Sequence, residues 1–267
     1  MLRLLISLCF FLLTAACTPG GGGRGGGGGG GGGGENDDDQ GDLIVSYDDA
    51  EGETAQIWEE AFQDNELPEN LAQVVNATYA LPHDVMFLLG ECGMINAFWA
   101  PSNDAIVMCW ELVIHMAEVF ANTGVTNEAA VEGAIQGWIW AFFHELGHAL
   151  IDLFDLPSTG QEEDAVDEFS TLMLIDYGYP VAAINGALYF FLVAGDPTPP
   201  ALADEHSLGE QRFYNVLCLV YGSDPTQELR DSLVSAFPEM DARLDRCPGE
   251  YEDKQDAWST LLEPHEL

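Results

Sequence analysis

The chain has 267 residues, and its 46 Asp and Glu far outnumber its 7 Lys and Arg, which gives a formal net charge of −39. A surface this negative repels nucleic acid and anionic lipid, so both are excluded as direct partners. The charge itself is explained by solubility or by adaptation to a salty habitat. Because clustered carboxylates attract divalent cations, metal binding alone would say little about function.

The first 42 residues predict an export signal followed by a tether. Residues 1–17 contain one early arginine and an apolar run too short to span a membrane, as in a secretory signal. They end in "TAAC", which resembles a bacterial lipoprotein signal in which Cys17 is lipidated; an ordinary secreted protein cut nearby is the alternative. Residues 18–42 are rich in Gly and Asp and predict a disordered tether.

We therefore expect an exported protein with a lipid anchor at Cys17, on the periplasmic or cell-surface side of the bacterial envelope. The anchor would be its only contact with the membrane. Residues 43–267 have the length of one domain with a sizeable core, and we expect this domain to be a monomer.

Four cysteines lie within residues 43–267, and an even number in an exported chain predicts disulfides. Four cysteines allow three pairings. We predict Cys92–Cys109 and Cys218–Cys247, because each of these bridges closes a short local loop. No CxxC spacing occurs, which disfavours zinc ligation by these cysteines.

The first half of the domain predicts helices and then a small sheet. Apolar residues at helical spacing indicate a helix over Thr54–Gln63 and another after Pro68. A short apolar run, Asp84–Cys92, predicts a buried strand. Two further strand-like pieces flank the turn at residues 101–104 and predict a hairpin.

The second half predicts helices only. We expect them over Glu111–Gly124, from Asn127 as cap to a stop at Pro157, over Gln161–Tyr177 and over Gly209–Gly222, followed by a terminal helical region. Together the elements predict an α+β domain that is mainly helical, with a small β-sheet at its front.

The stretch "HELGH" carries the clearest chemical signal. His144 and His148 are four residues apart, so both rings project from one face of a helix and can bind one Zn²⁺. Glu145 points to an adjacent face, from which it can reach water beside the metal without binding the ion. The apolar flanks of the motif disfavour the alternative, two histidines on an ordinary amphipathic helix. Gly147 is costly inside a helix, and we expect another backbone to pack against that turn.

A catalytic zinc needs a third protein ligand. The pattern H-E-x-x-H-x-x-G-x-x-H is absent, so we look to the next helix and choose Glu163, with Glu162 and Asp164 as competitors. Asp167 falls on the same face as Glu163 and can fix the tautomer of a ligand histidine. Asp152, one turn beyond His148, is a further candidate for that task or a solvated helix residue.

"HELGHALID" followed by "EEDAVD" resembles the gluzincin class of zinc peptidases. Together with "GECGMINAFW", "MCWELV" and "DEHSLGEQRFYNVLCLVYG", these stretches also resemble an uncharacterised bacterial family of metallopeptidases. The resemblance implies a zincin-like fold and one Zn²⁺ per chain, held by His144, His148 and Glu163, with Glu145 as general base. It implies a peptide or protein substrate and does not specify which.

Hydrolysis also needs a donor that stabilises the oxyanion. We choose His206 in "DEHSL" and Tyr214 in "QRFYN" as candidates. Arg212 is the first basic residue after Arg24, and we expect it to pair with a buried acid rather than to hold substrate. The strand-like residues 105–109 could offer a sheet edge to an extended peptide.

The sequence thus predicts a zinc-dependent peptide-bond hydrolase at the cell envelope. The alternative is a catalytically inactive, zinc-stabilised binding lipoprotein. The intact Glu145 argues against that alternative, because a purely structural metal site needs no general base. A plain acidic helical scaffold would leave the buried histidines unexplained.

Overall fold

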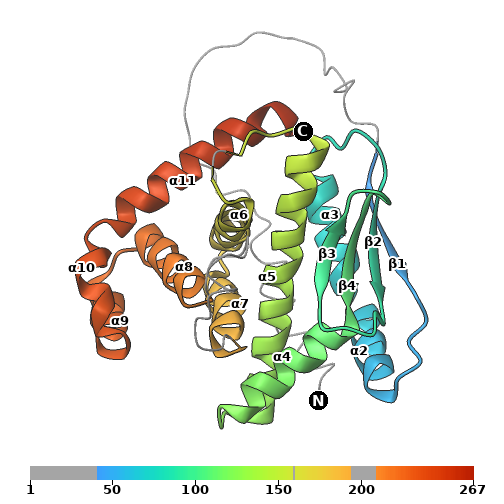
Figure 1. The fold of residues 1–267 in the computed structure, drawn as a ribbon, viewed down its shortest axis with the longest axis horizontal. Coiled ribbons are helices and arrows are strands. Elements are labelled where there is room, and N and C mark those ends of the chain that lie inside the picture. Colours follow the sequence, from blue (N-terminus) through green and yellow to red (C-terminus); the bar gives the residue numbers. More distant parts are fainter. Residues whose placement is uncertain (1–40, 159, 194–208) are drawn as a thin grey trace.

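The computed structural model describes residues 41–158, 160–193 and 209–267. They form a mainly helical α+β structure with one small sheet at its N-terminal end, as the sequence predicts (Figure 1). The predicted signal segment, the lipidation site Cys17 and most of the predicted tether lie outside the described residues. None of the helices in the described part combines the length and the apolar character that a membrane crossing needs.

The sheet has four strands in the order β1-β2-β4-β3. β1 pairs with β2 and β2 with β4 in parallel, whereas β3 pairs antiparallel with β4. The strands are β1 (Leu43–Tyr47), β2 (Val85–Gly90), β3 (Ala97–Ala100) and β4 (Ala105–Cys109). The predicted strand and hairpin are confirmed, and β1 is a strand that the sequence analysis missed.

β4 is an interior strand, so the prediction that residues 105–109 form an edge for a peptide is wrong. The parallel pairing with β2 covers one side of β4, and β3 covers the other. The free edge on this side of the sheet belongs to β3, which lies beside α5 (Figure 1).

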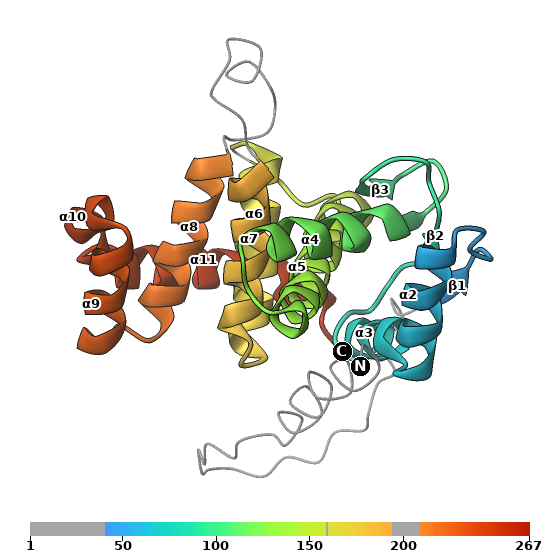
Figure 2. The ribbon, with the colours of Figure 1, turned by 90° about the horizontal axis from the view of Figure 1, so that it is seen from below.

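Three helices belong to the sheet end of the molecule. Two of them form the crossover that joins the parallel strands β1 and β2, and the third follows β4. They are α2 (Glu53–Asp64), α3 (Leu67–Asn76) and α4 (Trp110–Asn122), close to the predicted ranges. Figure 2 shows α2 and α3 beside the strands, at the opposite end of the molecule from α9 and α10.

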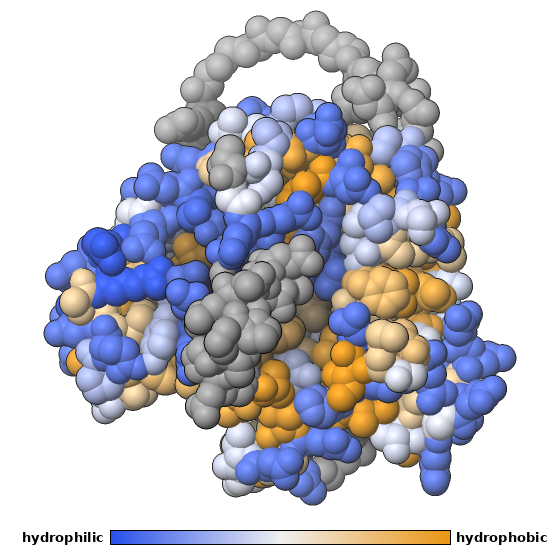
Figure 3. Space-filling view, viewed as in Figure 1, coloured by the Kyte–Doolittle hydropathy of each residue, from blue (hydrophilic) through white to orange (hydrophobic). Residues whose placement is uncertain are grey.

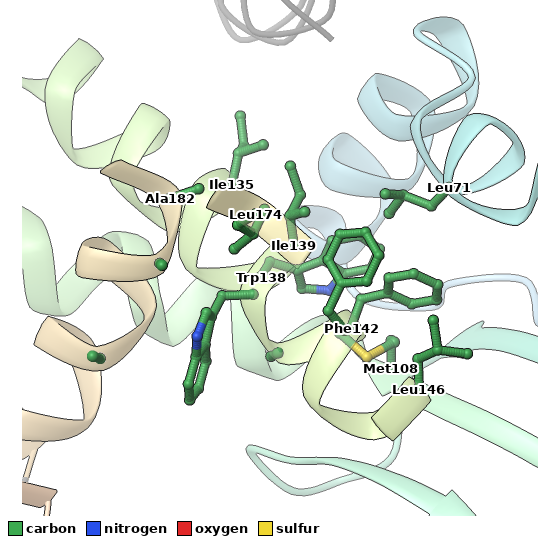
Figure 4. Packing of buried hydrophobic residues seen from close by; sticks show 14 of the residues in the cluster. Leu71, Met108, Ile135, Trp138, Ile139, Phe142, Leu146, Leu174 and Ala182 are labelled. Carbon is green, nitrogen blue, oxygen red and sulfur yellow. The ribbon is translucent and has the colours of Figure 1, made fainter. Parts of the chain in front are cut away.

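The long helix α5 (Asn127–Leu153) runs through the centre of the molecule (Figure 1). Its buried apolar side chains are distributed around the helix, which is the pattern of a helix inside a core. In Figure 4, Trp138, Ile139 and Phe142 of α5 pack near Leu71 of α3 and Met108 of β4. The helix with the HExxH motif is therefore held on several sides at once.

The predicted N-cap of α5 is wrong by one residue. The hydroxyl of Thr126 accepts a hydrogen bond of 3.3 Å from the N–H of Ala129, so Asn127 is the first helical residue. Thr126 has the extended backbone that an N-cap requires. The helix ends at Leu153, a few residues before the predicted stop at Pro157.

The remaining helices pack on the side of α5 away from the strands (Figure 1). They are α6 (Glu162–Asp176), α7 (Pro180–Val193), α8 (Gly209–Ser223), α9 (Gln227–Ala236), α10 (Asp241–Leu244) and α11 (Cys247–Leu262), with short 3₁₀ turns η2 (Pro238–Met240) and η3 (Glu263–His265). α6 and α8 agree with the prediction, and α7 was missed.

Both predicted disulfides are confirmed. Cys92 and Cys109 join the loop after β2 to the end of β4, and their Cα atoms are 5.5 Å apart. Cys218 and Cys247 join α8 to α11 with a Cα separation of 5.0 Å. The two bridges therefore secure the two ends of the molecule separately.

Candidate metal centre

Two histidines of α5 and one glutamate of α6 meet in the interior. Nε2 of His144 lies 3.3 Å from Oε2 of Glu163, and Nε2 of His148 lies 3.3 Å from Oε1 of the same carboxylate. The three residues offer ligand atoms that all lie within 4.8 Å of one another. The structure thus brings together the three residues that the sequence selected as ligands.

Gly147 lets α6 approach α5 closely enough for this meeting. A Cβ at that position would lie 2.9 Å from Val166 and 3.1 Å from Phe169, both on α6. We expected backbone to pack against this turn, and the structure shows side chains there instead. The missing side chain of Gly147 is what leaves room for them.

The other ring nitrogen of each histidine is held by a second carboxylate. Nδ1–H of His144 donates to Oδ1 of Asp167 over 2.8 Å, and Nδ1–H of His148 donates to Oε1 of Glu162 over 2.7 Å. These bonds fix both rings with Nε2 toward Glu163, so that each Nε2 can bind a metal once its proton is lost. The sequence predicted this task for Asp167 but treated Glu162 only as a competing ligand.

Arg212 of α8 completes the group from behind Asp167. Its Nε and Nη2 donate to the two oxygens of Asp167 over 2.6 and 2.7 Å, and both side chains are buried. The guanidinium carbon also lies 4.5 Å from the ring centre of Phe190 and 5.6 Å from that of Trp140. The expectation that Arg212 pairs with a buried acid is confirmed.

The charges of this group shift the pKa values of its members. Burial lowers the pKa of His144, but the hydrogen bonds with Asp167 and Glu163 outweigh burial and raise it to about 9. Burial raises the pKa of Asp167, and the Arg212 guanidinium and His144 together bring it below its ordinary value. The pKa of Glu163 is lowered because its two histidine partners outweigh burial. The carboxylates of Asp167 and Glu163 therefore stabilise a positive charge at the histidines that lie between them.

Glu145 lies on the neighbouring face of α5, toward the sheet. Its Oε2 accepts a hydrogen bond of 2.8 Å from the backbone N–H of Trp99 in the edge strand β3. The indole N–H of the same tryptophan donates to Asp152 over 3.0 Å. Asp152 thus secures β3 on α5, and the prediction that it orients a ligand histidine is wrong.

A pocket of about 170 Å³ opens beside His144 and Glu145. Most of its wall is apolar or aromatic, and part of that wall comes from β3 and from the end of α7. The wall includes Ile95, Ala97, Leu112, Trp140, Tyr189 and Phe190. In Figure 3 hydrophobic residues gather over the strands and in the lower centre of this face, whereas its left side is mainly hydrophilic.

The structure does not bring Tyr214 to this pocket. Its hydroxyl donates to Glu239, which raises the pKa of Tyr214 to about 12. Tyr214 follows Arg212 by two residues, or roughly 200° around α8, so the two side chains leave the helix on nearly opposite sides. His206, the other predicted oxyanion donor, lies outside the described residues.

A family model described as "Putative metallopeptidase" matches residues 47–262. The chain belongs to this metallopeptidase family. No curated protein and no solved structure matches the chain.

The donor set suits the metal that a metallopeptidase needs. Zinc binds imidazole nitrogen and carboxylate oxygen at about 2.0–2.2 Å, so its ligand atoms lie about 3–4 Å from one another. The two 3.3 Å separations around Glu163 agree with this. A second group, Cys92, Cys109 and Glu111, also has ligand atoms close together. Its two sulfurs are bonded to each other, so it is not a metal site.

Proposed function

We propose that this chain is a gluzincin-like zinc peptidase in which His144, His148 and Glu163 hold one Zn²⁺. The observation that carries the proposal is the orientation of both Nε2 atoms toward one carboxylate while both Nδ1 atoms are bound to others. A histidine cluster with a purely structural role would have no need of such an arrangement beside a pocket and a further glutamate. Zinc, when bound, supplies Lewis acidity that polarises a peptide carbonyl and makes water acidic near neutral pH.

Glu145 acts as the general base. It accepts a proton from the attacking water and delivers it to the leaving amine. Glu145 lines the pocket, so its carboxylate can reach both groups there. The bond from the Trp99 N–H fixes one of its oxygens, so the other carries the proton. Asp167 and Glu162 keep the histidines in the tautomer that binds metal.

The substrate is a peptide that lies along β3. This strand ends the sheet beside the pocket, and an extended peptide can add to such an edge through main-chain hydrogen bonds. The aromatic wall formed by Trp140, Tyr189 and Phe190 accepts an apolar side chain next to the bond that is cut. The surrounding negative charge disfavours acidic substrates.

The enzyme works outside the cytoplasm, tethered to the envelope through a lipid on Cys17, as a monomer. The two disulfides support export, because such bonds persist in oxidising compartments. Two measurements test the anchor. Globomycin, which blocks processing of lipoprotein signals, should leave the signal on the parent chain, and a Cys17→Ala variant should lose the lipid. Release of the variant into the soluble fraction is expected, and unchanged membrane association would contradict the proposal.

Glu145→Gln tests the function. It keeps the three ligands, so zinc content stays at one ion per chain, while hydrolysis of a peptide library falls by roughly 100-fold or more. Glu128→Gln, an exposed position in the first turn of the same helix, is the matched control and leaves hydrolysis unchanged. Equal hydrolysis by Glu145→Gln and the parent chain would exclude this mechanism. If the parent chain and both variants bind zinc but none of them hydrolyses peptides, the alternative of an inactive binding protein is favoured.

A further inference from the structure

A second pocket, of about 330 Å³, lies between α6 and α11 and is called here the α6–α11 pocket. It has about twice the volume of the pocket beside Glu145, which is about 170 Å³. Its volume falls at the lower end of the range of small-molecule sites. Among the residues that line it are Ile151, Leu156, Asp164, Glu168, Lys254 and Trp258.

The α6–α11 pocket is separate from the metal centre although both use the first turns of α6. Glu163 and Asp167 face the histidines and Arg212. Asp164 and Glu168 each follow one of them by one residue, a rotation of roughly 100° around the helix. None of the three proposed zinc ligands lines this pocket.

The charged side chains that line the pocket are Asp164, Glu168 and Lys254, so its wall carries an excess of negative charge. Glu168 forms an ion pair of 2.9 Å with Lys254, the single lysine of the chain. Oδ1 of Asp164 is buried and has no hydrogen-bond partner among the described residues. The amides in the first turn of α6 and the charge of Arg212 compensate part of the Asp164 charge, and Lys254 is engaged with Glu168.

The apolar part of the pocket determines what kind of cation fits. Trp258 is almost fully buried, and Ile151 and Leu156 extend the apolar wall from the end of α5. An inorganic divalent ion needs several oxygen ligands. Within the described part of the chain, Asp164 and Glu168 belong to no group of three residues able to hold a metal ion. A ligand that combines one positive charge with an apolar body satisfies both parts of the wall.

We propose that the α6–α11 pocket binds an organic monocation, with its ammonium or guanidinium group at Asp164 and its apolar part against Trp258 and Ile151. Such a group occurs in small alkylamines and in the lysine or arginine side chain of a peptide. The cation balances the excess negative charge of the pocket wall. The proposal does not depend on peptidase activity.

Titration calorimetry of the full chain with hexylammonium tests this proposal. In about 0.3 M sodium chloride, which screens the general attraction of the acidic surface, we expect saturable binding of one hexylammonium per chain. Hexanol should bind at least tenfold more weakly, and hexanoate should not bind. Asp164→Asn should weaken hexylammonium binding tenfold or more. Asp253→Asn, which removes one exposed charge from α11, should leave the binding unchanged.

Equal binding of hexanol, an unchanged Asp164→Asn variant or an equal loss in Asp253→Asn would overturn the proposal. Displacement of hexylammonium by an equal concentration of calcium would overturn it as well. If Asp164→Asn does not fold, Ala257→Phe, at an exposed position that lines the pocket, must abolish binding by filling the space. A capped tripeptide with a central lysine distinguishes the two sources: binding tighter than that of hexylammonium assigns the site to a peptide side chain, and weaker binding assigns it to a small amine.

Discussion

The two sides of α5 that serve the proposed reaction are held in place by different means. On the side of α6 and α8, the histidines are fixed by charged groups: Asp167 and Arg212, which are buried, and Glu162, which is exposed. On the side of the sheet, Glu145 is fixed by one backbone N–H of β3. The first arrangement depends on the balance of charges and the second on the position of a strand.

This difference fits the two tasks. A metal ligand must keep one orientation throughout, and charge-assisted hydrogen bonds in a buried place are the strongest means of achieving that. A general base must exchange protons with water, so a single neutral N–H holds it without removing its ability to accept. Charge-changing substitutions should therefore damage the ligand side far more than the base side.

Asp167→Asn should have the largest effect. It leaves the buried guanidinium of Arg212 without its anion, which costs about 3–5 kcal/mol of unfolding free energy. It also weakens the orientation of His144, so zinc affinity should fall about 10- to 100-fold. Urea unfolding and competition with a chelator measure the two effects. Asp176→Asn, near the other end of α6, is the matched control and should change neither by much.

A loss of less than about 1 kcal/mol in Asp167→Asn would show that the ligand side does not rest on this ion pair. In that case the packing of the guanidinium on Phe190 would have to hold Arg212 in place without the ion pair.

The ligand side was largely predictable because its geometry is local. Residues four apart on a helix share a face, which placed His144 with His148 and Glu163 with Asp167 before any tertiary contact was known. The scarcity of basic residues singled out Arg212 as the partner of a buried acid. The same helical spacing places Tyr214 and Arg212 on nearly opposite sides of their helix. The sequence therefore contained the information that excludes Tyr214 from the site that Arg212 joins.

The base side was not predictable because it depends on contacts between distant segments. Nothing in the spacing of "NAFW" shows that the N–H of Trp99 reaches Glu145, 46 residues away. β1 follows an acidic stretch, and its partner β2 lies two helices further on. α7 is apolar at almost every position, so it lacks the periodic signal that marked the other helices. The α+β class emerged without these elements, but the edge strand was assigned wrongly.

The second-largest effect, after that of Asp167→Asn, is expected in the pH dependence of zinc binding. In the metal-free protein His144 is protonated up to a pKa of about 9, so zinc must displace a proton at neutral pH. The pKa of His148 is raised as well, because its hydrogen bonds with Glu163 and Glu162 outweigh burial and the charge of His144. Apparent zinc affinity should therefore rise with pH, by about tenfold per pH unit for each proton released. Chelator competition at several pH values below 9 measures this slope, and a flat profile would contradict the raised pKa values.

Gly147→Ala should have a smaller effect on the ligand side. The added methyl lies 2.9 Å from Val166, so α6 must move or repack, at a cost of about 1–3 kcal/mol that the better helix propensity of alanine partly offsets. Because α6 carries Glu163, zinc affinity should fall together with the melting temperature. Adding Val166→Ala should restore only part of both, because the Cβ of residue 166 and the ring of Phe169 still lie 2.9 and 3.1 Å from the added methyl. Gly137→Ala is the control, since its nearest contact is the flexible sulfur of Met116 at 3.2 Å; an equal loss in this control would show that any methyl on α5 is disruptive.

Trp99→Phe should have the smallest effect and isolates the base side. It removes the indole bond to Asp152 but keeps the backbone N–H that binds Glu145. One partly exposed hydrogen bond contributes about 1 kcal/mol, so we expect a modest loss of stability, a higher KM for peptides that lie along β3 and no change in zinc affinity. Asp152→Ala should match it, and the double variant should lose no more than either one, because the two residues share one interaction. If Trp99→Phe weakened zinc binding as strongly as Asp167→Asn, the two sides of α5 would be coupled, and the distinction between a charge-held and a strand-held side would fail.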